Sequence, residues 1–401
     1  MKKIFAFVLA IIFVVSVIYE YKNIVYGGAD RNLETTTSYE TTTAQRQNSN
    51  DKDNKNTDLT KSLEIQLYEN LTENEKEAYN TILEAMRNHK SSTTVSPNID
   101  NDRIFDIVHL ICYCHPELFW VKNNGTYYSD GKFVIDYLYS KKEAKEIQPL
   151  IEQRAREIIE KIGPSDDEYT LSLAIYDYIV KSTIYNDAAA ENHDEYPRVS
   201  TIEGVILDGT AVCGGYSKAY QYLLSLVGID AITITGYAYT PTEPGYHAWV
   251  AQKVNGEIYL SDPTWGDGYE ESGHSDFVNH AYFLMSSAEI EKTHQCDELY
   301  KNIRSTYERD NYFVKQNTYF EKYDQASISN ALKTCIENNE SAVQLKFANE
   351  QECQKAKEDL IDNLNIHSIF KTVDPSHEKI DASKATYNID DTHNIITVFY
   401  N

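Results

Sequence analysis

The sequence predicts an α+β fold in which one helix packs on an antiparallel sheet, with helical sequence before it and a small α+β domain after it. Apolar residues recur at helical spacing through much of the sequence between residues 62 and 228. From Gly228 the pattern changes to strand-like alternation, and it contains an Asn255-Gly256 pair typical of a two-residue hairpin turn. After residue 305, strand-like and helical segments follow one another in short succession.

The composition excludes one class of partner. The 401 residues include 62 acidic and 37 basic side chains, for a formal net charge of −25. Because the phosphates of a nucleic acid would repel such a chain, we expect no nucleic-acid partner. Six cysteines are too few to form a disulfide scaffold in a chain of this length.

The N-terminal segment, residues 1–29, predicts contact with a membrane. Lys2 and Lys3 precede an apolar run from residue 4 to residue 19, slightly shorter than the roughly 20 residues that span a bilayer. We expect an uncleaved signal anchor, with a cleaved signal peptide as the alternative, and the remaining chain on the extracytoplasmic side. Residues 30–61 have almost no large apolar side chains, which predicts a disordered linker.

A mainly helical extension is expected over residues 62–164. Thr72-Glu73-Asn74-Glu75 is a capping-box pattern at the start of an apolar stripe. A second helix is expected from Ile104 to Cys112, and a short strand from Lys132 to Tyr139. A long amphipathic helix then ends at Gly163-Pro164.

The segment 165–295 is expected to carry the chemistry. A helix is predicted around residues 169–181, followed by a polar loop over 186–201 that lacks an EF-hand or zinc spacing and is expected to be solvated. Another apolar helical stripe follows Cys213 and ends at Gly228. Strands are expected over residues 231–239, 247–254 and 257–261.

The hairpin turn permits a geometric prediction. If Asn255 and Gly256 are the turn residues, the two strands pair residue for residue on either side of them. Asp262 is then the diagonal neighbour of His247 on the same face of the sheet, within reach of its side chain. A register slip of one residue would place the two side chains on opposite faces. The turn therefore predicts that Asp262 orients the His247 ring.

Cys213 is expected at the start of its helix. There the helix dipole favours a thiolate, and backbone N–H groups can stabilise an oxyanion. Gly214 and Gly215 are expected to leave room for a substrate. A thiol, a base and an orienting carboxylate together predict thiol acyl transfer, in which the Cys213 thiolate attacks an amide and His247 protonates the leaving amine.

The C-terminal segment, residues 305–401, is expected to form a separate small α+β domain. Its predicted helices cover residues 328–336 and 354–364. Its predicted strands cover residues 312–320, 342–347, 366–373 and 395–400.

Three motifs, Val212-Cys213-Gly214-Gly215-Tyr216-Ser217, His247-Ala248-Trp249 and Asp262-Pro263-Thr264-Trp265, resemble those of the transglutaminase-like superfamily, which has a papain-like fold. The resemblance covers about residues 165–290, and the flanking regions resemble extensions of secreted bacterial members. It implies that Cys213 is the nucleophile, His247 the base and Asp262 the orienter. It also implies cleft or packing positions for the neighbouring residues, and we expect these to line the cleft: Gly214, Gly215, Tyr216, Tyr246, Trp249 and Trp265.

The resemblance leaves the reaction open. Members of the superfamily crosslink glutamine to lysine, cleave peptide or amide bonds, or are inactive. We expect an enzyme that acts on protein or cell-wall peptide amides, by hydrolysis or by transamidation. The alternative is a non-catalytic cell-surface binding module that keeps the fold.

No cofactor and no metal are expected. Calcium dependence belongs to a subset of the superfamily, and no acidic cluster in this sequence matches it. Cys112-Tyr113-Cys114-His115 is half of a zinc-like pattern, but no second Cys/His pair accompanies it. The two thiols are therefore expected to be apolar residues near the end of a buried helix.

Overall fold

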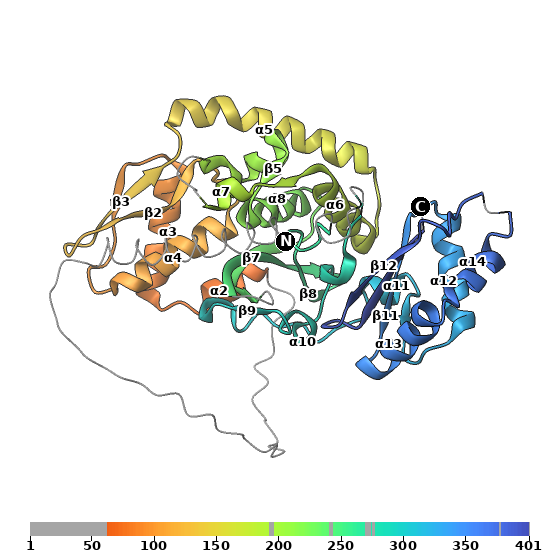
Figure 1. Cartoon of the computed structure of the whole chain (residues 1–401). Coiled ribbons are helices and arrows are strands. Elements are labelled where there is room, and N and C mark those ends of the chain that lie inside the picture. The colour runs from red at the N-terminus through yellow and green to blue at the C-terminus, as the bar shows by residue number, and fades with distance from the viewer. Residues whose placement is uncertain are drawn as a thin grey trace, which may run out of the picture.

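The computed structural model describes residues 62–191, 196–239, 244–268, 274, 277–376 and 378–400. The segments expected as an anchor and a linker, residues 1–29 and 30–61, lie outside these ranges. Within them, no helix combines the length and apolar character that crossing a membrane requires. The chain forms the mixed α and β structure that the sequence predicts (Figure 1).

A four-stranded antiparallel sheet in the order β8-β7-β6-β9 lies at the centre of the larger part. Its strands are β6 (Ala231–Tyr239), β7 (Pro244–Val254), β8 (Glu257–Ser261) and β9 (His294–Cys296). Helix α8 (Cys213–Leu226) packs on β6 and β7 through its apolar stripe, so the helix that begins with the cysteine lies on the sheet that carries the histidine. Helix α6 (Glu168–Ser182) packs beside α8.

The β7–β8 hairpin has the predicted register. Asn255 and Gly256 have φ angles of 54° and 81°, as a type I′ turn requires. Val254 pairs with Glu257, and the ladder continues to the Val250–Ser261 pair. Asp262 directly follows Ser261, the last residue of β8. The register therefore places Asp262 diagonally across from His247, as predicted.

The N-terminal extension combines helices with a small sheet that the sequence reading partly missed. The predicted capping box is present, because Thr72 caps the first turn of its helix and Glu75 bonds back to the Thr72 N–H. The elements are α2 (Leu63–Glu69), α3 (Glu73–Arg87), β1 (Ser92–Thr94), α4 (Asn101–Cys114), β2 (Val121–Tyr127), β3 (Lys132–Tyr137) and α5 (Lys141–Ile162). Strand β2 escaped prediction because its centre, Lys-Asn-Asn-Gly-Thr, is polar and lacks strand-like alternation.

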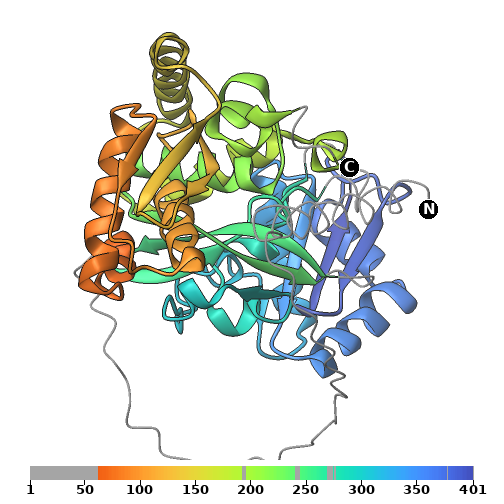
Figure 2. The same cartoon turned by 90° about the vertical axis from the view of Figure 1, so that its left-hand side faces the viewer.

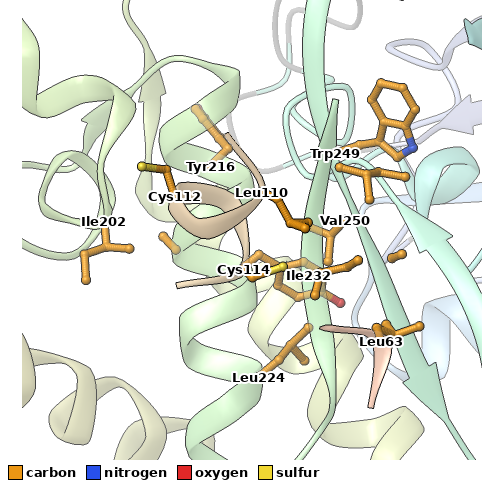
Figure 3. Packing of buried hydrophobic residues seen from close by; sticks show 14 of the residues in the cluster. Leu63, Leu110, Cys112, Cys114, Ile202, Tyr216, Leu224, Ile232, Trp249 and Val250 are labelled. Atoms are coloured by element: carbon orange, nitrogen blue, oxygen red, sulfur yellow. The ribbon is translucent and has the colours of Figure 1, made fainter. Parts of the chain in front are cut away.

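Figure 2 shows the N-terminal extension beside the central sheet, and one hydrophobic core joins the two (Figure 3). Leu63 and Leu110 from the extension lie in the same buried cluster as Ile232 and Val250 of the sheet. The buried Gln221 side chain on α8 donates to the Cys114 carbonyl at 3.0 Å and accepts from the backbone N–H of Thr233 at 2.9 Å. These contacts fix α4, α8 and β6 to one another.

Cys112 and Cys114 are buried, free thiols in this core, as the sequence predicts. Burial raises the pKa of Cys112 to about 11, so its thiol stays neutral. His115 contacts Glu64, Glu117 and Tyr79 through its ring nitrogens.

Short elements connect α6 to α8 and the sheet to the C-terminal part. The first group is β4 (Ile184–Tyr185), α7 (Asp187–Glu191), η1 (Pro197–Ser200), η2 (Gly204–Asp208) and β5 (Thr210–Ala211). The second group is η3 (His280–Tyr282), α10 (Ser287–Ile290), η4 (Glu298–Tyr300) and α11 (Tyr312–Lys315). The polar loop expected over 186–201 is therefore partly helical, while residues 192–195 lie outside the described chain.

The C-terminal part has its own core and a sheet in the order β10-β11-β13-β12 (Figure 1). Its elements are β10 (Tyr319–Phe320), α12 (Gln325–Glu337), β11 (Ala342–Phe347), α13 (Glu350–Lys357), η5 (Glu358–Asp362), α14 (Ile366–Val373), β12 (Thr386–Asp390) and β13 (Ile395–Phe399).

Two strand predictions in the C-terminal segment are wrong. Residues 366–373 form helix α14, because their apolar residues at positions 366, 369, 370 and 373 have helical spacing. Residues 312–320 divide into helix α11 and the two-residue strand β10, since Asn311 caps a helical turn at Phe313.

Candidate active site

Cys213 is the first residue of helix α8, as the sequence predicts. The N–H groups of Gly215 and Tyr216 bond back to the Val212 carbonyl at 2.8 and 3.1 Å. The first N–H groups of a helix have no acceptor within the helix, which leaves those of Cys213 and Gly214 directed out of its end. Cys213 is half-buried at this end of the helix.

The start of α8 is held against the preceding turn by close backbone packing. The Val212 N–H donates to the Val199 carbonyl at 3.1 Å. A Cβ atom at Gly215 would lie 2.1 Å from the same carbonyl oxygen, so only glycine fits there. This corrects the expectation that Gly215 makes room for substrate, because its open side faces protein backbone. A Cβ at Gly214 would have its nearest neighbour at 3.7 Å.

His247 and Asp262 form the predicted pair. The His247 Nε2 atom lies 2.8 Å from Asp262 Oδ2, and the carboxylate is fully buried. The other carboxylate oxygen accepts the backbone N–H groups of Thr264 and Trp265 at 2.9 and 3.2 Å. This turn fixes the carboxylate, so Asp262 can hold the imidazole in a single orientation.

The Cys213 thiol lies close enough to the His247 ring to favour its protonated form. Because Nε2 is directed at Asp262, Nδ1 is the nitrogen left for sulfur. Burial opposes protonation of the ring, but the Asp262 carboxylate and Cys213 raise the pKa of His247 to about 10. Burial also disfavours the Asp262 anion, yet His247 and a further histidine hold the pKa of this carboxyl well below its usual range. At neutral pH the pair is therefore an imidazolium with a carboxylate.

His294 is a site residue that the sequence reading missed. Its Nε2 atom lies 3.2 Å from Asp262 Oδ2, the same oxygen that His247 contacts. It lies on the three-residue strand β9, which pairs with β6 through Ala238. Neither a motif nor a helical or strand-like pattern surrounds it, so only the tertiary pairing reveals it.

His247, Asp262 and His294 form the one cluster in the described ranges whose ligand atoms lie close enough for a metal ion, within 4.8 Å of one another. Two imidazoles and a carboxylate are a donor set that zinc accepts. However, a carboxylate only accepts hydrogen bonds, so each Nε2 atom carries a proton toward Asp262. The three groups satisfy one another as a hydrogen-bonded unit.

Three further cleft predictions are corrected. Tyr216 is fully buried, and its hydroxyl donates to the Thr183 carbonyl at 3.1 Å. Trp249 is 1% exposed and packs against His294 with ring centroids 5.0 Å apart. Tyr246 precedes His247 on β7 and points to the opposite face of the sheet. Tyr216 and Trp249 are therefore packing residues, and Tyr246 bonds to Thr235 and Asp297 on the other face of the sheet.

For Trp265 and Gly214, a role in lining the cleft stays a prediction. Trp265 is partly exposed, and its ring centroid lies 5.9 Å from that of His247. Gly214 offers one of the two backbone N–H groups at the start of α8.

Residues 155–265 match the family model of the transglutaminase-like superfamily. The chain therefore contains a transglutaminase-like domain, and this domain includes Cys213, His247 and Asp262. The predicted papain-like arrangement, with the cysteine helix on the sheet of the histidine and aspartate, is the architecture observed around them.

The curated relatives are more distant and longer. The kyphoscoliosis peptidase of Homo sapiens is 26% identical over 167 residues, which cover 37% of this chain and 24% of that protein. The kyphoscoliosis peptidase of Mus musculus is 23% identical over 204 residues, or 46% of this chain and 30% of that protein. The matches thus span less than a third of these relatives.

Two solved structures show limited similarity. A crystal structure of a TGase is 19% identical, with a TM-score of 0.27, over 32% of this chain and 34% of that chain. A candidate cysteine protease from Cytophaga hutchinsonii is 20% identical, with a TM-score of 0.23, over 30% of this chain and 37% of that chain.

Proposed function

We propose that the protein is a thiol enzyme that acts on amide bonds of proteins or peptides through a thioester on Cys213. The observation that carries this proposal is that the Cys213 thiol lies near the His247 ring, which is itself bonded to the buried Asp262 carboxylate at 2.8 Å. A nucleophile, a base and an orienting group in direct contact are what covalent acyl transfer needs.

The proposed reaction begins with attack of the Cys213 sulfur on the amide carbonyl carbon. The backbone N–H groups of Cys213 and Gly214 stabilise the resulting oxyanion. His247 then gives its Nδ1 proton to the amide nitrogen, the C–N bond breaks, and an amine leaves behind a thioester. Water or a second amine attacks the thioester and returns a proton to His247, which releases a carboxylic acid or a new amide.

Hydrolysis and transamidation remain two outcomes of the same site. The kyphoscoliosis proteins carry the name peptidase, which favours hydrolysis. The substrate that we propose is a protein or a cell-wall peptide outside the cytoplasm, with the chain held at the membrane by residues 1–29. This location rests on the sequence pattern of that segment.

To test the proposal, the full chain and its Cys213→Ala variant are each incubated with a glutamine-donor protein and a fluorescent primary amine. Amine incorporation and new N-termini are measured in both. Cys213-dependent amine incorporation supports a transglutaminase, and new N-termini without incorporation support a peptidase. Cys296→Ala is a matched control, because Cys296 is also half-buried and lies two residues after His294. If both signals are absent and iodoacetamide leaves Cys213 unlabelled at neutral pH, the chain is a binding module.

A further inference from the structure

We propose that His294 is a positioning residue for this reaction, which holds the Asp262 carboxylate in the orientation that directs the His247 ring at the thiol. The inference rests on the proposed function. Asp262 receives two backbone N–H groups on Oδ1 and two imidazole nitrogens on Oδ2. His294 supplies one of these four contacts and does not itself reach the reacting atoms.

The tautomer of His294 follows from its two neighbours. Because a carboxylate cannot donate, Nε2 carries the proton that it gives to Asp262. Nδ1 then accepts from the Thr293 hydroxyl at 2.8 Å. The same hydroxyl lies 3.3 Å from the Ile290 carbonyl, but its single proton goes to the closer acceptor, Nδ1. Thr293 therefore selects the tautomer that His294 needs in order to donate to Asp262.

The surroundings keep His294 neutral and dry. Its side chain is fully buried, with the Trp265 and Trp249 rings at centroid distances of 4.7 and 5.0 Å. Burial lowers the pKa of His294, and the hydrogen bond to Asp262 only partly offsets this. The titratable groups that act on it are Asp262, His247 and His393, the last from the turn between β12 and β13.

Sharing one oxygen between two donors has a chemical consequence. A neutral donor on Oδ2 withdraws part of the carboxylate's hydrogen-bonding capacity from His247. Asp262 then stabilises the imidazolium less strongly than an unshared carboxylate would. His247 remains a better proton donor to the leaving amine, since a general acid works best when its pKa is not far above the working pH.

The experiment compares the full-length wild type with His294→Phe, which removes the donor but keeps a ring, and with His294→Gln, which keeps a donor. For His294→Phe we expect kcat to fall roughly tenfold with little change in KM. We also expect the pKa of His247 to rise, as followed by the ring ¹³C signal of labelled histidine. His294→Gln should recover most of both. Thr293→Val, which leaves the buried ring in place, should show the same changes in weaker form.

Two results would overturn the inference. One is a folded His294→Phe variant, by circular dichroism and thermal unfolding, with wild-type kcat and an unchanged His247 titration. The other is equal impairment of His294→Gln and His294→Phe, which would show that the ring only fills space. If His294→Phe does not fold, Thr293→Val decides alone by the same two readouts. The histidine titration needs no substrate, so an inactive wild type would refute the proposed function while the shift of His247 still tests His294.

Discussion

The Ser217 hydroxyl donates to the Ala248 carbonyl at 2.9 Å, in a buried bond that joins helix α8 to strand β7. Ser217 lies one helical turn after Cys213, and Ala248 is next to His247 along the strand. This bond therefore helps to fix the distance between the proposed nucleophile on α8 and the proposed base on β7. It contacts neither the Cys213 sulfur nor the His247 ring.

Ser217→Ala should loosen this connection. We expect a loss of about 1 kcal/mol in the free energy of unfolding, the usual net value of one buried hydrogen bond. We also expect a several-fold lower kcat with KM nearly unchanged, because the distance between sulfur and imidazole is no longer fixed. Urea denaturation and steady-state kinetics measure the two effects. Ser225→Ala is the matched control on the same helix, since Ser225 is exposed and bonds only to its own helix; an equal effect there would contradict the prediction.

Asp262→Asn should move the titration of His247 toward neutral pH. In the folded wild type the pKa of His247 is raised above its ordinary value to about 10. The contribution of its protonated form to the free energy of unfolding is therefore complete below about pH 6.5 and is lost as the pH rises from there through 10. Without the carboxylate, burial dominates and the pKa of His247 falls. We expect the alkaline limb of the activity profile and of the unfolding free energy to shift to lower pH together. If the alkaline limb of the activity profile stays near pH 10 in the variant, the group that titrates there is not His247.

The sequence predicted those parts of the site that depend on local chemistry. The Asn255-Gly256 turn determines the hairpin register, and the register brings Asp262 to His247. His294 depends on a pairing between β9 and β6 across more than fifty residues, and no local pattern encodes it. The sequence also did not predict the packing role of Gly215, because its neighbour Val199 comes close to it only in the folded chain.

The two glycines after Cys213 should respond differently to alanine. Gly215→Ala places a Cβ atom 2.1 Å from the Val199 oxygen and 2.9 Å from the Ala211 Cβ, so backbone must shift. We expect a destabilisation of about 1–3 kcal/mol, typical of overpacking. Gly214→Ala meets only ordinary contacts and should fold as the wild type does. If it then loses activity, the space at Gly214 is used by substrate. Equal unfolding midpoints for the two variants would contradict the packing that the structure shows.

Gln344 on β11 should couple the unfolding of the C-terminal part to that of the transglutaminase-like domain. Its amide accepts the His280 backbone N–H at 3.1 Å and donates to the Val278 carbonyl at 3.0 Å. It also contacts His280 Nδ1 at 2.9 Å, while Nε2 of that ring lies 2.9 Å from Asp177 of α6. Because Nε2 carries the proton that the Asp177 carboxylate accepts, Nδ1 is the acceptor, and the Gln344 side chain satisfies three groups across the two parts.

Gln344→Leu keeps the side-chain size but leaves these three groups without partners in a buried contact. Since each unmet group costs about 1–3 kcal/mol, we expect a loss of at least about 3 kcal/mol and a thermal unfolding transition that separates into two. Gln354→Leu is the control, because Gln354 is exposed on α13 and contacts only Glu358. A single transition at the wild-type midpoint would mean that the contacts of Lys346 with Glu289 and of Phe399 with His274 suffice to hold the two parts together. Cys213-dependent activity that survives separation would assign the C-terminal part a role other than bracing the site.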